Sequence, residues 1–146
     1  MLIHTSRFGA LAIEPQDILH FQAGLPGLPA CNEWVLLADA SHDALGWLQS
    51  SSHPEIALAV VSPRRFVPNF QMRVAHRDLE ALRLADIDEA QVLVIVASNE
   101  GRLTVNLKAP LVFNLREQRG VQVVAKDDHS LQHLLPNQSP LLRKSA

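Results

Sequence analysis

A few short groups of residues carry the side-chain types that catalysis requires. Ser41-His42-Asp43 contains the three residue types of a hydrolase triad. A triad needs side chains that converge from separate elements, because nucleophile, base and acid form a chain of hydrogen bonds. Three consecutive residues cannot form that chain, so a turn between two strands is the simpler interpretation. We therefore predict no catalytic residue at this position.

Two histidines near the C-terminus have the types and spacing of metal ligands. His129 and His133 are four residues apart and follow Asp127 and Asp128. On a helix they would share one face, but a metal site needs further ligands that the sequence does not specify. The segment also opens a polar, proline-containing stretch. We favour a solvated tail over residues 129–146 and expect neither a metal nor a cofactor.

The single cysteine, Cys31, excludes an intrachain disulfide and fits a reducing compartment. Its thiol would become a nucleophile only if a neighbouring group lowered its pKa. Cys31 adjoins the apolar run at 34–37, and buried structural cysteine is common in such surroundings. We interpret it as a core residue.

Arg64, Arg65 and Phe66 lie between two prolines and form a basic stretch with one aromatic side chain. Such a loop could contact phosphate or stack on a base. The whole chain has a net charge of -2 and a pI of about 6.4, whereas nucleic-acid binders usually carry a basic excess. Direct nucleic-acid binding is therefore disfavoured. A small barrel that binds nucleic acid or a small ligand through this loop remains the alternative function.

The common signatures of enzymes and membrane proteins are missing from the sequence. It has no G-x-x-x-x-G-K-[ST], G-x-S-x-G, H-E-x-x-H or C-x-x-C motif. No apolar run approaches the ~18 residues of a membrane span, and the N-terminus does not resemble a signal peptide. We expect a non-enzymatic, cytoplasmic protein with no membrane partner.

Short apolar runs separated by Gly, Pro, Asp and Ser predict the elements that position these residues. With 146 residues, 47% of them hydrophobic, the chain has the size and composition of one globular domain. Alternation at 70–74 and 103–107 is typical of strands with one wet face. The connections are too short for many parallel crossovers. We predict an all-β or nearly all-β domain over 1–128, a small, mostly antiparallel barrel or roll with at most one or two short helical turns, one of them at 78–83.

These patterns also single out one turn. Gly24, Pro26 and Gly27 form a structural turn, since Gly allows positive φ and Pro removes an amide donor.

Six segments, taken in order, resemble the flagellar assembly factor FliW family. Together they span about residues 1–128. The segments are Phe21–Leu28 (F-x-x-G-L-P-G-[FL]), Trp47–Ser50 (W-L-Q-S), Pro54–Pro63, Val92–Val96, Thr104–Asn114 (N-L-x-A-P-[IL]-V-x-N) and Arg119–Gln122 (R-G-V-Q in this chain). Lys108 departs from a commonly apolar position, and the tail after His129 does not align.

The resemblance implies a β-barrel-like fold, no enzymatic activity and two protein partners. One partner is flagellin, which the factor holds before secretion. The other is the translational regulator CsrA, whose repression of flagellin synthesis the free factor relieves.

The segment 102–114 is where we expect a partner to bind. Alternation places Leu103, Val105 and Leu107 in the core, and leaves Thr104, Asn106 and Lys108 facing outward. With the resemblance, this alternation predicts that Thr104, Asn106 and Lys108 lie on or beside a partner-binding surface.

Overall fold

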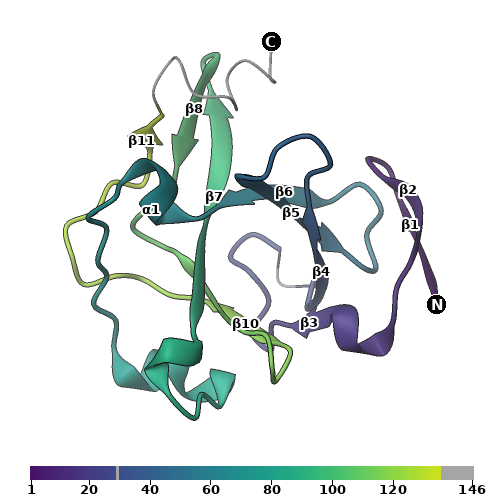
Figure 1. The fold of residues 1–146 in the computed structure, drawn as a ribbon, viewed down its shortest axis with the longest axis horizontal. Coiled ribbons are helices and arrows are strands. Elements are labelled where there is room, and N and C mark those ends of the chain that lie inside the picture. The colour runs from purple at the N-terminus through teal and green to yellow at the C-terminus, as the bar shows by residue number, and fades with distance from the viewer. Residues whose placement is uncertain (29, 136–146) are drawn as a thin grey trace.

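Short strands joined by tight turns close into a barrel in the computed structural model, which describes residues 1–28 and 30–135 (Figure 1). Within that part of the chain, seven strands form the barrel in the order β7-β6-β5-β4-β3-β10-β9, and β9 pairs back to β7. Every pairing is antiparallel except β10 against β3. The strands of the barrel are β3 (Ile18–His20), β4 (Glu33–Ala38), β5 (Leu45–Ser50), β6 (Ala57–Val61), β7 (Gln91–Asn99), β9 (Leu111–Asn114) and β10 (Arg119–Gln122). The predicted fold class is confirmed.

The remaining elements decorate the barrel. Strands β1 (Leu2–Thr5) and β2 (Gly9–Ala12) form a separate hairpin. Strands β8 (Arg102–Val105) and β11 (His133–Leu134) extend the sheet beyond β7. Short helical turns are α1 (Pro63–Phe66), η1 (Pro15–Asp17), η2 (His76–Leu82) and η3 (Ile87–Glu89), and η2 covers most of the turn predicted at 78–83.

The barrel interior is filled by side chains from strands on all sides. Trp34, Leu48 and Leu111 are fully buried there, and Phe21 meets Phe113 edge to face with ring centroids 5.6 Å apart. Cys31 belongs to the same cluster, with its thiol 3.4 Å from Nδ1 of His53. Its burial agrees with the interpretation as a core residue.

Three further apolar clusters lie against the barrel wall among the described residues, one of them formed by Leu82, Val112 and Val123 beside η2. The β1–β2 hairpin covers β3 and β4 by packing Ile3 and Ile13 against Ile18 and Val35. On the other side, a second cluster is buried beneath α1 and the chain around β11. Its buried members are Val61, Phe70, Val94, Val105, Leu107 and Leu135. The wall of the barrel is therefore apolar on both faces over much of its area.

The chain remains attached to the sheet beyond residue 128, the position after which the sequence predicts a tail. His133 and Leu134 pair with β8, and Leu135 donates its N–H to the carbonyl of Leu103 at 3.0 Å. The Leu135 side chain is only 1% exposed. Backbone pairing and one buried leucine thus tie down a segment whose composition is polar. Residues 136–146, the remainder of the expected tail, lie outside the described residues.

The alternating segment 70–74 is extended, but the prediction of a strand there is wrong. Phe70, Met72 and Val74 are buried or half-buried while Gln71 and Arg73 are exposed, as the pattern implied. No neighbouring strand pairs with the segment among the described residues. Gln71 and Arg73 instead hydrogen-bond to the chain at 126–129, and the Arg73 carbonyl accepts from the Lys126 N–H at 2.6 Å.

Glu89 clamps the short turn η3 to the barrel and makes stability depend on pH. Its carboxylate accepts hydrogen bonds from Arg116 Nε at 2.8 Å and from the Ala85 N–H at 2.7 Å. These donors, Arg116 first, lower the pKa of Glu89 from 4.5 to about 2. Because the pKa is lower in the folded state, the stabilisation is complete above pH 4.5 and is lost as pH falls towards 2.

We expect Glu89→Gln to melt below the parent at neutral pH, and the difference in melting temperature to shrink as pH falls below about 4. Thermal melts across this range measure it. Glu55→Gln is the matched control, because Glu55 is exposed and makes no side-chain hydrogen bond within the described chain. A difference in melting temperature between Glu89→Gln and the parent that is the same at every pH would contradict this role.

Candidate protein-binding site

A half-buried tryptophan on the outside of the barrel is held by three different contacts. Trp47 lies on β5, and its indole Nε1 donates to Asp39 Oδ1 at 3.1 Å. Phe8 meets the indole edge to face, with ring centroids 5.9 Å apart. The Arg7 guanidinium lies 4.2 Å from the centre of the indole ring, a cation–π contact. Trp47 is therefore fixed in orientation while part of its ring remains accessible.

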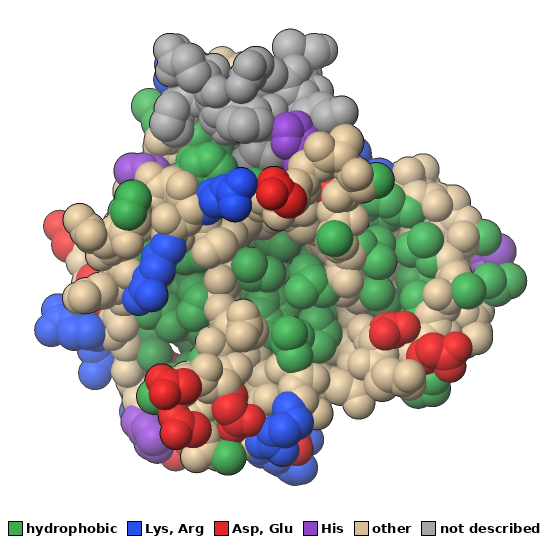
Figure 2. Space-filling model, viewed as in Figure 1, with side chains coloured by type: hydrophobic (Ala, Val, Ile, Leu, Met, Phe, Trp, Pro, Cys, Tyr) green, Lys and Arg blue, Asp and Glu red, His purple; other side chains and the backbone are tan. Residues whose placement is uncertain are grey.

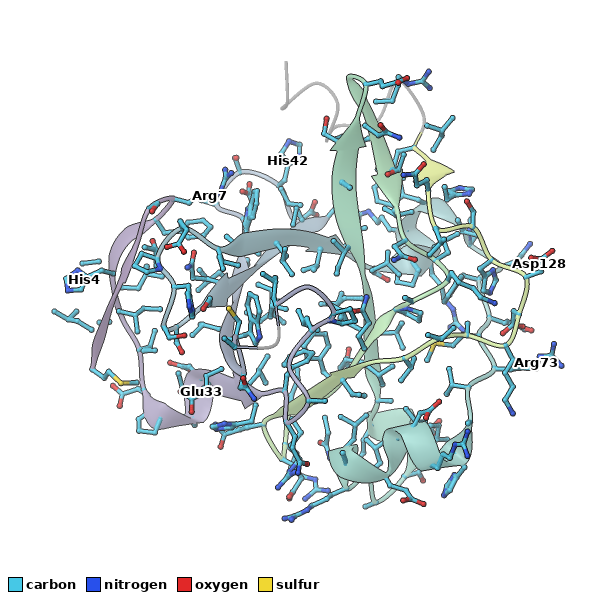
Figure 3. All side chains as sticks on the ribbon, turned by 180° about the vertical axis from the view of Figure 1, so that it is seen from behind. His4, Arg7, Glu33, His42, Arg73 and Asp128 are labelled. Carbon is cyan, nitrogen blue, oxygen red and sulfur yellow. The ribbon has the colours of Figure 1, made fainter. Side chains whose placement is uncertain are left out.

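The residues around Trp47 form a cleft of about 570 Å³. Arg7 comes from the β1–β2 turn and His42 from the β4–β5 loop, and Figure 3 shows both at the same end of the molecule. The β7–β8 hairpin provides the opposite wall with Val96 and Leu103. Trp and Arg are among the side-chain types that dominate protein–protein binding energies, and here they lie over an apolar floor.

The charge on Asp39 is secured by the same contacts. The Trp47 N–H, together with the N–H and hydroxyl of Ser41, donates to the carboxylate and lowers the pKa of Asp39 below 3.8. Asp39 is therefore ionised at neutral pH. With Arg7 over the indole ring, the cleft presents both signs of charge and suits a partner with mixed polarity.

Strand β8, which we expect to bind a partner, borders this cleft. The residues that it buries differ from those that alternation predicts. Leu103, which we predicted to be in the core, is half-buried and lines the cleft. Thr104 is 3% exposed, so the prediction that it faces outward is wrong. Strand β8 lies between β7 and β11, and Thr104 sits opposite Ala97 on one side and Leu134 on the other. Neighbours on both sides cover a residue that alternation alone assigned to solvent.

Asn106 and Lys108 follow β8 in a loop and are both half-buried. The Asn106 Oδ1 accepts the backbone N–H groups of Lys108 at 3.1 Å and Ala109 at 3.0 Å. The Lys108 Nζ donates to the carbonyl of Asp127 at 2.7 Å. Each side chain thus has a contact that holds the loop in shape.

The triad and metal-ligand patterns do not assemble into sites. Ser41 Oγ donates to Asp39 at 3.0 Å, and Asp43 accepts from Arg65 at 3.4 Å. His129 donates from Nε2 to the Gln71 carbonyl at 2.6 Å, while His133 is in β11. Across residues 1–28 and 30–135, no three His, Cys, Asp or Glu side chains lie close enough to hold a metal ion.

The basic stretch at 64–66 is folded into the structure. Arg64 Nε donates to the Phe70 carbonyl at 3.1 Å, and Phe66 packs against the outer apolar cluster. Arg65 pairs with Asp43. These contacts account for all three side chains, although both guanidinium groups remain exposed.

The turn at 24–27 has the geometry its sequence suggests. The Leu28 N–H donates to the Leu25 carbonyl at 2.8 Å, so Pro26 and Gly27 occupy the central positions of a β-turn. Gly27 has φ 82° and Gly24 has φ 67°. A positive φ at the second central position is that of a type II turn, which strongly favours glycine.

We expect Gly27→Val to lower the free energy of unfolding by about 1–2 kcal/mol through backbone strain. No other atom lies within 4 Å of a Cβ placed at this site, so the loss is conformational rather than steric. Gly27→Asn is the matched control and should lose less, because asparagine tolerates positive φ. Urea titration measures both. Equal stability of the valine variant and the parent would mean that the turn is loose.

Sequence reasoning missed the cleft because its parts are far apart in the chain. Asp39 and Trp47 are neighbours across the β4–β5 hairpin, whereas Arg7 reaches the indole ring only because the β1–β2 hairpin folds over the barrel wall. Trp47 itself was visible as an apolar strand residue. The available signal was that a large aromatic side chain is rare here, since aromatics make up only 5% of the chain.

No helix among the described residues has both the length and the apolar character needed to cross a bilayer. The molecule is thus defined by its fold and surface as a small β-barrel with a preformed, mixed-polarity cleft of the kind used in protein recognition.

Comparison with known proteins identifies the family. The family model described as FliW protein matches residues 2–135. The flagellar assembly factor FliW of Bdellovibrio bacteriovorus is 36% identical over 131 residues, which cover 88% of this chain and 75% of that protein. The factor of Thermoanaerobacter pseudethanolicus is 31% identical over 134 residues, 90% of this chain and 89% of that protein. A crystal structure of the flagellar assembly factor FliW superimposes with a TM-score of 0.86 at 25% identity, covering 95% of this chain and all of that one. The chain belongs to the FliW family.

Proposed function

We propose that this protein is a non-enzymatic, cytoplasmic assembly factor that binds flagellin before its secretion. When no flagellin is bound, it binds the translational regulator CsrA and relieves the repression of flagellin synthesis. The observation that carries the proposal is the match to the FliW family over nearly the whole described chain. Its relatives are named flagellar assembly factors, a name that points to a partner in the flagellum.

The cleft around Trp47 is the proposed contact surface for one of these partners. Its aromatic anchor is oriented by Phe8 and Asp39 before any partner arrives, so little side-chain entropy is lost on binding. Asn106 and Lys108 stay proposed as residues beside this surface, since they follow the strand that forms the cleft wall. Because both hold the loop together, we assign them to positioning that wall rather than to direct contact.

Co-purification tests the proposal. The tagged protein should retain flagellin and, in a separate experiment, CsrA, each from the same organism. A short RNA in a filter-binding assay provides the comparison with the alternative function. Capture of either protein without RNA retention supports the proposal. Retention of RNA with no capture of flagellin or CsrA would favour direct nucleic-acid binding.

A further inference from the structure

The extended segment 70–75 leaves half of its backbone hydrogen-bonding groups unused. Arg73 bonds to the chain at 126–127 through its N–H, which donates to the Asp127 carboxylate, and through its carbonyl. Within residues 1–28 and 30–135, the N–H and C=O groups of Met72 and Val74 have no hydrogen-bond partner. In an extended chain successive residues direct these groups to opposite sides. One edge of the segment is therefore occupied and the other is open.

A second unpaired edge faces this one across a groove. Residues 91–93 of β7 pair with β9 on one side only, since β6 first meets β7 at Val94. Segment 70–75 runs from α1 towards η2, whereas β7 runs from η3 in the opposite direction (Figure 1). The groove is thus bounded by two antiparallel backbone edges, each lacking a strand partner within the described chain.

The groove between these edges has a volume of about 880 Å³ and an apolar floor with Met72, Val74, Leu79 and Val92. Figure 2 shows the hydrophobic side chains gathered in a hollow left of centre, with a basic side chain above it and acidic ones below. Its two ends have opposite charges. Arg64 is anchored beside Phe70 at one end, and Asp88 lies beside the start of β7 at the other. Within the described residues, neither forms an ion pair.

We propose that this groove binds an extended segment of a partner protein, which adds a strand between segment 70–75 and β7. The charges select the occupant. It has alternating apolar side chains, an acidic residue at the Arg64 end and a basic residue at the Asp88 end. The open N–H and C=O groups of Met72 and Val74 supply the main-chain hydrogen bonds of strand addition. The groove is separate from the Trp47 cleft, and the inference does not depend on which partner the protein has.

Five residues of extended chain span roughly 17 Å, so a peptide of about seven residues with charged ends fits the groove. The probe is a synthetic peptide with the sequence acetyl-Asp-Val-Thr-Val-Thr-Val-Lys-amide. Titration into the full chain should shift the backbone amide resonances of Met72 and Val74 and protect them from hydrogen exchange. The same peptide N-methylated at its valines cannot donate those hydrogen bonds and should not produce the shifts.

Charge reversal tests the specificity. Asp88→Lys should weaken binding of the peptide by roughly fivefold, the size expected for one partly exposed charge pair. A peptide that has Asp at both ends should recover the loss in this variant and bind the parent more weakly. Arg102→Glu, an exposed change on β8, should leave both affinities unaltered.

Absence of amide shifts at Met72 and Val74 with every peptide would overturn the proposal. Shifts that depend on protein concentration but not on peptide would overturn it as well, because the occupant would then be a second copy of the chain. Binding of the N-methylated peptide with equal affinity would exclude strand addition.

Discussion

Alanine in place of Leu135 should destabilise the protein by about 2–5 kcal/mol, the cost of truncating a leucine in a packed core. Leu135 is 1% exposed and packs with Val105 and Leu107 in the outer apolar cluster. The adjacent Leu134 is 54% exposed, so Leu134→Ala should change stability by no more than about 0.5 kcal/mol. Urea denaturation of the two variants measures the contrast.

This pair of neighbours decides where the folded domain ends. If Leu135 contributes as much as its burial implies, the chain up to 135 is part of the cooperative unit, and a truncation at 128 should unfold far more readily. Equal midpoints for Leu134→Ala and Leu135→Ala would show that β11 is a loosely attached end. The boundary first expected at 128 would then stand.

Removal of the Trp47 side chain should have the largest effect on partner binding. Truncating a central interface tryptophan typically costs at least 2 kcal/mol, so we expect Trp47→Ala to weaken binding to the partner that uses the cleft by about 30-fold or more. The residue is half-buried on the outer wall, and some loss of stability will accompany the change. Isothermal titration with flagellin and with CsrA, each tested separately, measures the loss.

A second substitution separates binding from folding. Among the described residues, the exposed Arg7 side chain lies over the face of the Trp47 ring, so Arg7→Glu should lower the free energy of unfolding by no more than about 1 kcal/mol, the size of an exposed cation–π contact. It places a negative charge beside Asp39 and should weaken the same interaction. Arg102→Glu reverses an exposed charge of the same sign outside the cleft and is the matched control. If Arg7→Glu and Trp47→Ala both bind flagellin and CsrA as tightly as the parent does, the cleft is not the binding site for either partner. The proposed function would not be contradicted by that result.

The sequence predicted the local conformation better than the pairing. Period-2 alternation appears at 70–74 and at 103–107, and the chain is extended at 70–74 and at 103–105. Only the second forms a strand over much of its length, because β7 folds back beside it. Pairing is a non-local property, and alternation describes one chain at a time.

Alternation also left open which face of a strand is covered. At 103–107 it implied one wet face, yet Thr104 is buried and Leu103 borders the cleft. The rule assumes one core on one side of the sheet, whereas this barrel has apolar clusters inside and outside its wall. The turn at 24–27 was readable because its constraint is local: a positive φ at Gly27 depends on that residue alone.

The resemblance to a known family, rather than the residue patterns, led to the proposed function. No single residue in the chain points to flagellin or CsrA, and the candidate cleft combines residues from four separated segments. Whole segments in a fixed order identified the family, which the match over residues 2–135 and the superposition with a crystal structure then established.

The most direct test of the account is translation of flagellin messenger RNA in a purified system. CsrA from the same organism should repress synthesis, and adding this protein should restore it in proportion to its concentration. Subsequent addition of flagellin should reinstate the repression, because flagellin-bound protein is no longer available to CsrA. Repression that persists at a large excess of this protein, with CsrA still bound to the message, would contradict the proposed function.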